Sequence, residues 1–336
     1  MLREISIAFQ TDKSAGDYIA LAQLVNQYDF DRVSVYCDAP FHPSYGPLLL
    51  MAPHIYRAKL GPAAVSPSRI HPIDIAAQAA LLAQVAQGGV YIGIARGAWL
   101  EQHGIAEKKP AIQAVREAVE IVRYLLSGSR GGYTGKVFQI AENVYAPYPT
   151  PDVAIPVMIG TWGPRMCALA GEIADEVKVG GSANPALVPL IQRYIADGER
   201  RTGRHTGTVG VAMGAVTVID EDREQARAVA RQSVALYLPI VAALDSTVDV
   251  EPELVERLRV LADQHDYSAA ANLVSDELLD LFAFSGAPDD LIQQAEGLFD
   301  AGVQRIEFGT PHGINPGTGV ALIGEKVLPA LRTHWL

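Results

Sequence analysis

The stretch Ile159-Gly160-Thr161-Trp162-Gly163-Pro164-Arg165 joins a short apolar strand to a helix through a turn that contains two glycines. Pro164 suits the first position of the following helix, because the N–H that proline lacks would have no partner there. Free backbone N–H groups at such a helix start can hold a phosphate, helped by the helix dipole and by Arg165. The alternative is an ordinary strand–helix turn without a ligand.

A second glycine-rich turn, Gly180-Gly181-Ser182, follows the next predicted strand. Neighbouring strands of a parallel sheet bring their carboxyl ends to the same edge, so the two turns should lie close together. Two such turns favour phosphate binding over the ordinary turn.

Short apolar strands and longer helices alternate regularly along the whole chain. The predicted strands are residues 5–10, 32–36, 58–65, 90–95, 156–160, 176–179, 209–219 and 304–308. The predicted helices are residues 16–28, 73–86, 110–126, 164–174, 186–201, a helix from 223, and 320–331. Eight such units predict an α/β protein whose parallel sheet closes into a (β/α)₈ TIM barrel.

Two insertions account for the length of the chain. A (β/α)₈ barrel typically needs about 250 residues, whereas this chain has 336. Residues 127–151, rich in Gly and Pro, predict an irregular excursion with a short hairpin, and residues 245–287 predict a largely helical one. We expect one domain over residues 1–336. The alternative is a two-domain doubly wound enzyme, but no glycine fingerprint follows the first strand.

The composition excludes several classes of protein. The 38 acidic and 27 basic side chains give a net charge of −11, and nucleic-acid binders usually carry a basic surplus. Two cysteines, Cys37 and Cys167, exclude a disulfide framework and fit a reducing compartment. The sequence shows no secretion signal and no apolar run of about 18 residues. We expect a soluble, cytoplasmic protein that binds neither nucleic acid nor membrane.

The common motifs of built-in chemistry are missing from the sequence. It contains no His-Glu-x-x-His or Cys-x-x-Cys pair, no Gly-x-Ser-x-Gly elbow and no Walker phosphate loop. We therefore expect no metal site. A barrel with phosphate-binding turns and no reactive group of its own predicts that a bound organic cofactor carries out the chemistry on a small molecule.

Two further strand ends carry candidate ligand-binding residues, since barrel enzymes place their chemistry at the carboxyl ends of the strands. Ala63-Ala64-Val65 has small side chains that let a flat ligand approach the backbone, although a rigid loop would look the same. Arg96 and Gly97 end the fourth strand. Arg96 could contact an anionic ligand or could equally be a paired surface charge.

In this order and at these spacings, the motifs resemble the luciferase-like (bacterial luciferase superfamily) flavin and deazaflavin oxidoreductases. Within that superfamily, the chain looks most like the coenzyme F420-dependent methylenetetrahydromethanopterin reductase branch. The segments that carry the resemblance are residues 60–67, 93–97, 159–164 running into 169–175, and 302–311.

The resemblance implies a barrel that binds coenzyme F420 or FMN at its C-terminal face and commonly forms a homodimer or higher homo-oligomer. It implies that the turns at residues 160–165 and 180–182 hold the cofactor phosphate. It also implies that residues 63–65 line the tricyclic ring and contain a cis peptide bond that precedes no proline.

One position departs from the branch, which carries a glutamate near the end of the first strand, thought to protonate the pterin nitrogen. This chain has Ala8 there. Gln10 can form hydrogen bonds but cannot supply a proton. We expect that Asp38 or His42 takes the role, or that the substrate is a different one.

Three hypotheses follow from the sequence. The first is an F420-dependent oxidoreductase that moves a hydride between the cofactor C5 and a small organic substrate, with a methylene-tetrahydropterin or folate as the candidate. The second is a two-component monooxygenase that uses FMN. The third is a non-catalytic binding barrel, which side chains blocking the turn at residues 160–165 would favour.

The net charge raises a question about an anionic cofactor. A charge of −11 repels the anionic tail of F420, although salt screens the repulsion beyond about 8–10 Å. We expect local arginines to offset it, with Arg96, Arg165 and Arg130 as the candidates.

Overall fold

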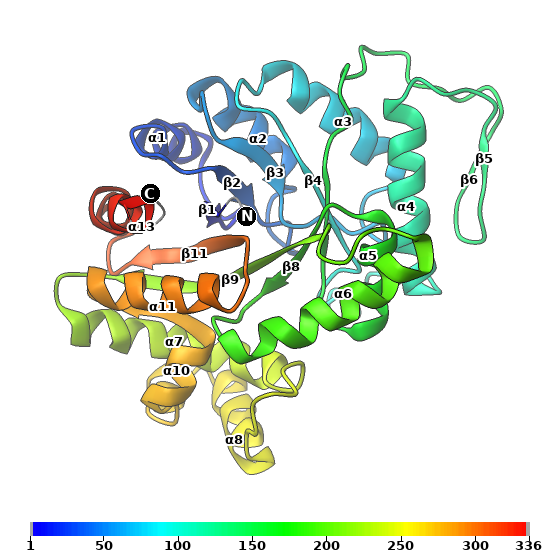
Figure 1. Ribbon diagram of the computed structural model, residues 1–336. Helices are drawn as coiled ribbons and strands as arrows, with labels where there is room; N and C mark the ends of the chain where they lie inside the picture. The colour runs from blue at the N-terminus through cyan, green and yellow to red at the C-terminus, as the bar shows by residue number, and fades with distance from the viewer. Residues whose placement is uncertain (1–2, 334–336) are drawn as a thin grey trace.

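The computed structural model describes residues 3–333 and shows eight parallel strands around a central axis, with helices outside them (Figure 1). In sheet order the strands are β3 (Lys59–Pro62), β2 (Arg32–Val35), β1 (Glu4–Phe9), β11 (Arg305–Gly313), β9 (Gly210–Ile219), β8 (Glu176–Gly180), β7 (Val157–Gly160) and β4 (Ile92–Ala95). Bridges from Leu60 to Val90 and from Val65 to Ile94 join β3 to β4 and complete the circle. The predicted (β/α)₈ barrel is confirmed.

Helices cover the outside of this barrel. They are α1 (Ala15–Val25), α2 (Tyr45–Met51), α3 (Pro72–Val85), α4 (Ala111–Leu126), α5 (Pro164–Ile173), α6 (Val188–Thr202), α7 (Arg223–Val241), α11 (Pro288–Asp300), α12 (Pro316–Leu322) and α13 (Leu328–Thr333). Two of them, α2 and α11, were not predicted. No helix within residues 3–333 is both long and apolar enough to cross a lipid bilayer.

The single helix predicted over residues 320–331 is interrupted in the structure. α12 and α13 are separated by a π-helical turn over Ile323–Val327. Gly324 lies against the ring of Tyr28, where a Cβ atom would come within 2.2 Å of the ring. This close approach accompanies the local change in helical pitch.

The insertion at residues 127–151 contains the expected hairpin. Its strands β5 (Tyr133–Thr134) and β6 (Gln139–Ile140) are antiparallel. The hairpin lies on the outer side of α4 (Figure 1). The buried Glu117 carboxylate of α4 accepts hydrogen bonds from the backbone N–H groups of residues 136–138, so an internal charge anchors the excursion.

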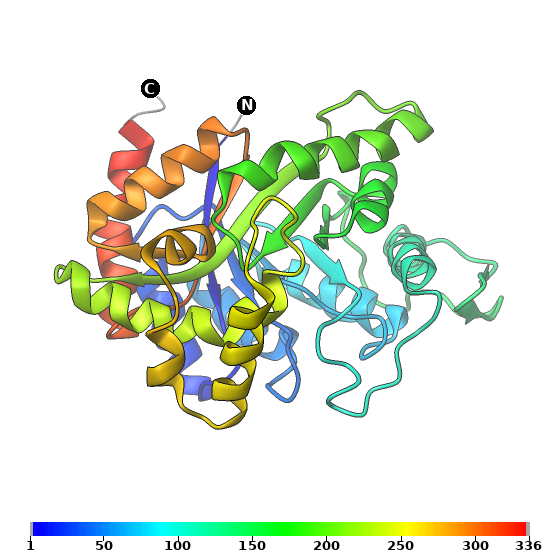
Figure 2. The same ribbon diagram turned by 90° about the horizontal axis from the view of Figure 1, so that it is seen from below.

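The second insertion is largely helical, with α8 (Pro252–Asp263), α9 (Tyr267–Ala271) and α10 (Asp276–Phe282). Figure 2 shows these helices gathered with α7 on one side of the barrel. The prediction missed the short strand β10 (Ala283–Gly286) at its end. Because β9 is ten residues long, its second half, residues 216–219, offers an edge with which β10 pairs in parallel.

Charged side chains fill the inside of the barrel. The Arg305 guanidinium donates to Glu176 at 2.6 and 3.0 Å and to Glu307 at 2.9 Å. Lys178 pairs with the other Glu307 oxygen, and the Ser34 hydroxyl also donates to Glu307. The four charged side chains are between 0% and 8% exposed. Such buried charges are tolerated only when every one is paired, as they are here.

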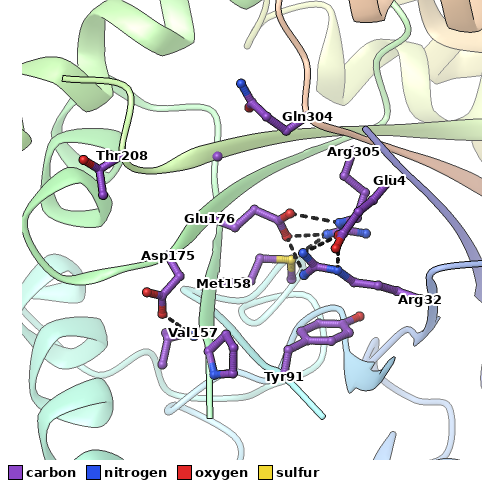
Figure 3. Close-up of a pocket in the computed structure, with 12 residues that line it drawn as sticks. Glu4, Arg32, Tyr91, Val157, Met158, Asp175, Glu176, Thr208, Gln304 and Arg305 are labelled. Carbon is purple, nitrogen blue, oxygen red and sulfur yellow. Dashed lines mark hydrogen bonds and ion pairs between the residues drawn. The ribbon is translucent and has the colours of Figure 1, made fainter. Parts of the chain in front are cut away.

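A cavity of about 230 Å³ opens at the amino ends of the strands. Figure 3 shows that charged side chains from several strands converge in it. Arg32 pairs with Glu4 at 2.5 Å and with Glu176 at 3.4 Å, so these lining charges are paired with one another. The cavity lies at the opposite end of the barrel from the predicted glycine turns. Because this end of a (β/α)₈ barrel serves stability, we do not place the chemistry there.

The ion pairs of Glu307 predict how stability depends on pH. Lys178 and Arg305 outweigh the effect of burial and lower the pKa of Glu307 from 4.5 to about 2. A carboxyl whose pKa is lowered by folding stabilises the protein above its unfolded pKa and loses that contribution as the pH falls towards its folded pKa. We expect the free energy of unfolding to drop by on the order of 3 kcal/mol between pH 4.5 and 2 from this group.

Urea unfolding at a series of pH values measures this dependence. The Glu307→Gln variant, which has lost the titrating carboxyl, should be less stable at neutral pH and should lose stability less steeply in acid. Parallel curves for the two proteins would contradict the prediction.

Candidate active site

The two predicted glycine turns lie side by side at the carboxyl ends of β7 and β8. The Trp162 indole N–H donates to the carbonyl of Gly180 at 3.0 Å, and the Thr161 N–H donates to the carbonyl of Lys178 at 2.9 Å. Trp162 also packs against both buried apolar clusters of the protein. One side chain therefore fastens the two turns together.

The surface of these turns is open. A Cβ atom added to Gly163 or to Gly180 would meet no atom within 4 Å. Gly163 caps the ten-residue helix α5, which begins at Pro164 as predicted, and Arg165 is exposed in its first turn. The turn at residues 160–165 is thus not blocked by side chains, as the non-catalytic hypothesis would require.

The loop after β8 owes its shape to its own hydrogen bonds. Gly181 has a φ of +88°, which favours glycine, and its N–H donates to the carbonyl of Gly214 at 2.6 Å. The buried Ser182 hydroxyl accepts a hydrogen bond from the Asn184 N–H at 3.1 Å. Ser182 therefore shapes the loop through its side chain.

The second insertion is fastened to this loop by a buried carboxylate. The Asn184 side-chain amide donates to Asp245 at 2.9 Å and to the Thr247 hydroxyl at 2.9 Å. The other Asp245 oxygen accepts from the Thr247 N–H at 2.9 Å. Asp245 is 1% exposed. Residues 245–247 thus hold the loop that carries Gly181 and Ser182.

Small residues form a floor beside the two turns. A Cβ atom on Gly160 would lie 3.3 Å from that of Ala95 and 3.8 Å from that of Ala64, so β7, β4 and the end of β3 meet here without bulky side chains. The Ala63–Ala64 peptide bond is cis and precedes no proline, as the resemblance implies. The Val65 N–H donates to the carbonyl of Gly93 at 2.9 Å and ties this segment to β4.

The arginines proposed to offset the acidic charge differ in their surroundings. Arg96 is exposed and donates two hydrogen bonds to Glu107, so its charge is already paired. Its neighbour Gly97 has a φ of +101°. Arg130 lies in the first insertion over the ring of Tyr145, 4.0 Å from its centroid. Of the three, Arg165 is the one that lies beside the glycine turns.

The residues suggested for acid–base chemistry are only partly brought together. The side-chain amide N–H of Gln10 donates to Asp38 at 3.2 Å, and the side-chain oxygen of Gln10 accepts from the Thr11 backbone N–H at 2.8 Å. His42 is exposed, and only its backbone N–H is tied to this group, by a 3.0 Å hydrogen bond to the carbonyl of Thr11. Gln10 and Asp38 form a pair, whereas the His42 side chain stands apart from it.

Three side chains at the floor of this face were not predicted. The Tyr36 ring lies over the Lys178 ammonium, 5.1 Å from the ring centroid, and Lys178 pairs with Glu307. Strands β2, β8 and β11 alternate polar and apolar residues, as in Glu176-Val177-Lys178-Val179. That alternation indicates one polar face to each strand and is the signal that could have revealed them.

Metal ligation has no candidate cluster: no three His, Cys, Asp or Glu side chains gather as a possible metal site among residues 3–333.

Comparison with known families identifies the fold. The family model described as luciferase-like monooxygenase matches residues 4–305. The chain belongs to the luciferase-like family. A curated member, the 5,10-methylenetetrahydromethanopterin reductase of Archaeoglobus fulgidus, is 31% identical over 300 residues, which cover 86% of this chain and 87% of that protein.

Two solved structures share the fold across their whole length. The coenzyme F420-dependent tetrahydromethanopterin reductase of Methanopyrus kandleri superposes with a TM-score of 0.87 at 23% identity and covers 98% of this chain and 100% of that one. An F420-dependent secondary alcohol dehydrogenase, solved with an F420–acetone adduct, superposes with a TM-score of 0.80 at 19% identity. It covers 99% of this chain and 100% of that one.

The buried carboxylate at residue 245 gives a prediction for this luciferase-like protein. Asp245→Ala leaves the Asn184 amide and the Thr247 N–H each without one partner, and a buried polar group without its partner costs about 1–3 kcal/mol. We expect the free energy of unfolding, measured in urea, to fall by that amount. Asp249→Ala, at an exposed position four residues away, is the matched control and should change it little. Equal losses in both variants would contradict the assignment.

Proposed function

We propose that this protein is an F420-dependent oxidoreductase that moves a hydride between C5 of the deazaflavin and a small organic substrate. One observation carries the proposal: two open glycine turns meet a floor of small residues that contains the cis Ala63–Ala64 bond. A phosphate and a flat ring need these two surfaces side by side. The F420-dependent glucose-6-phosphate dehydrogenase of Nakamurella multipartita, which is 28% identical over 82% of this chain, supports F420 as the group that they hold.

The residues fit such a cofactor. The free N–H groups at the start of α5, with Arg165 beside them, would hold its phosphate, as helix N-termini hold anions in general. Gly180 and Gly181 would complete that surface. Ala64, Ala95 and Gly160 would lie against the ring, where larger side chains would prevent its approach. When bound, the deazaflavin supplies the hydride, and the protein orients the partners and excludes water.

The substrate that we propose is a methylene-tetrahydropterin or the related folate. The reductases of Archaeoglobus fulgidus and Methanopyrus kandleri act on a methylene derivative of tetrahydromethanopterin according to their names, and the first is similar in sequence over most of its length. The Gln10–Asp38 pair provides hydrogen-bonding groups at the end of β1 for the polar ring of such a substrate.

Reduced FMN is the alternative cofactor, because a phosphate turn does not distinguish the two ring systems. The family model is described by its monooxygenases, whereas the two solved structures above are named as F420-dependent enzymes. A two-component monooxygenase would consume oxygen when supplied with reduced FMN, and an F420 enzyme would not.

A cofactor titration is the decisive measurement. We expect saturable binding of F420 to the purified protein, followed by fluorescence, and weaker binding of FMN. Gly180→Ala adds a methyl group where nothing in the protein is within 4 Å. It should therefore leave the unfolding midpoint unchanged and raise the Kd for F420 at least about tenfold.

Gly46→Ala is the matched control for that variant. Its methyl group also enters open space, but in α2, away from the glycine turns, and it should leave the Kd for F420 unchanged. Absence of saturable F420 binding to the wild-type protein would refute the proposal. Unchanged affinity in Gly180→Ala would refute the assignment of the glycine turns.

We also propose a homodimer that works in the cytoplasm as a single domain. Leu50, Tyr56, Leu81 and Val85, in or beside the neighbouring helices α2 and α3, are large apolar side chains between 37% and 54% exposed. An apolar surface of this kind supports a protein interface.

The oligomeric state can be measured by light scattering coupled to size-exclusion chromatography. The measured mass should be twice the 36.0 kDa chain mass, and the Leu81→Glu variant should have a mass closer to that of the monomer. A monomeric wild-type protein would contradict this.

A further inference from the structure

Reduction of a methylene carbon that bridges two nitrogens needs a proton as well as a hydride. The carbon accepts the hydride, its bond to one nitrogen breaks, and the released nitrogen must be protonated, a task for which a positioned acid contributes about 10²–10⁴-fold in rate. Gln10 has no acidic proton to give, and Ala8, on the inward side of β1, has no functional group. The donor must therefore be another group at the carboxyl end of the barrel.

Tyr36 lies at the carboxyl end of β2, and the alternation of side-chain directions along a strand points it into the barrel. Ser34 of β2 points into the barrel, where its hydroxyl bonds to Glu307, so the side chain two residues later points inward as well. The Tyr36 N–H donates to the carbonyl of Phe9 at 2.9 Å, which extends the β1–β2 pairing by one step beyond β2. Tyr36 thus stands one layer above Ser34, at the face that carries the candidate site.

Two small residues make room for this tyrosine. A Cβ atom on Gly309 of β11 would come within 2.6 Å of the Tyr36 hydroxyl, so the phenol reaches across to β11. Strand β1 lies between β2 and β11, and its inward residue Ala8 pairs in register with Ser34, one layer below Tyr36. On the other side, Ile7 pairs with Phe308, so Ala8 lies next to Gly309. The Tyr36 hydroxyl therefore occupies the space above Ala8 that a longer side chain would fill.

The charges around Tyr36 suit a proton donor. Below the ring lies the Lys178 ammonium, held by Glu307, and a cation under an aromatic face is attracted to it. Among residues 3–333 the Tyr36 hydroxyl makes no hydrogen bond, and Tyr36 is partly buried with some of its surface exposed, so the hydroxyl can bond to a ligand. Burial of the phenol raises the pKa of Tyr36 well above 10, and electrostatic repulsion from Glu307 and Tyr237 adds to this effect. The phenol therefore stays protonated.

We propose that the Tyr36 hydroxyl is the proton donor of the reaction, a role that rests on the proposed F420-dependent reduction. The bridging methylene carbon gains the hydride, and its bond to one of its two nitrogens breaks, with the electron pair of that bond going to the released nitrogen. The released nitrogen takes the proton from Tyr36. Water returns a proton to the phenolate and accepts the one that the oxidised cofactor releases. The substrate is reduced by two electrons and the cofactor is oxidised by two.

The test compares Tyr36→Phe with the wild-type protein, with methylenetetrahydromethanopterin and methylenetetrahydrofolate as the substrate probes and reduced F420 as the donor. We expect kcat to fall at least about 100-fold, with KM, the Kd for F420 and the Tm unchanged, because the lost hydroxyl has no partner in the protein. The pH profile is the discriminating readout. Wild-type kcat should be flat from neutral to alkaline pH, whereas the residual kcat of the variant should fall about tenfold per pH unit, since hydronium must then supply the proton.

Tyr91→Phe is the matched control. It removes another hydroxyl inside the same barrel, one that is bonded to Ser34 at 2.7 Å and donates to the carbonyl of Gly61 at 3.1 Å. It should lower the Tm and leave kcat and its pH profile unchanged. Similar kcat in Tyr36→Phe and wild type, or an equal loss in Tyr91→Phe, would overturn the proposal. So would F420 binding without turnover of either probe, whereas absent F420 binding would mean that the proposed function itself fails.

Discussion

The interior of the barrel depends on one buried carboxylate, that of Glu307. It joins β11 to β8 through Lys178, to β2 through Ser34 and to its own strand neighbour Arg305, which in turn binds Glu176. Removing such charges from water costs several kcal/mol for each ion, and only complete pairing offsets that cost. Every strand that contributes to the network is thereby held at one register relative to the others.

The network of ion pairs around Glu307 runs from one end of the barrel to the other. At the amino ends of the strands, Arg32 and Glu4 extend the ion pairs to a cavity that we assign to stability. At the carboxyl ends, the same network ends on Lys178 beneath the ring of Tyr36. A hydrocarbon interior would support the fold equally well, but it would leave no fixed charge beneath the candidate site.

The sequence predicted those features whose signals are local. Apolar strands, proline at helix starts and glycine in turns lie within a few residues of one another, so the eight strands and the hairpin insertion were recognised. The neighbouring positions of the turns at residues 160–165 and 180–182 follow from the parallel order of β7 and β8. Strand β10 was missed because its partner, the end of β9, lies more than 60 residues away in the sequence.

The polar interior and the position of Tyr36 were missed for a related reason. The alternation in Glu176-Val177-Lys178 shows that a strand has a polar face, but such a face usually meets water, and only the closed barrel turns it inward. Glu307 and Lys178 are 129 residues apart, so no local pattern pairs them. His42 was proposed from its place after β2, yet a loop position does not fix the direction of a side chain.

Trp162 has a consequence beyond its own hydrogen bond to Gly180. Because its indole spans the ends of β7 and β8 and packs on both apolar clusters, the protein itself holds together the two halves of the proposed anion-binding surface. Ordering flexible segments on association lowers affinity, and a surface built in advance avoids that entropic cost. The barrel would therefore offer the proposed cofactor a surface that is already formed.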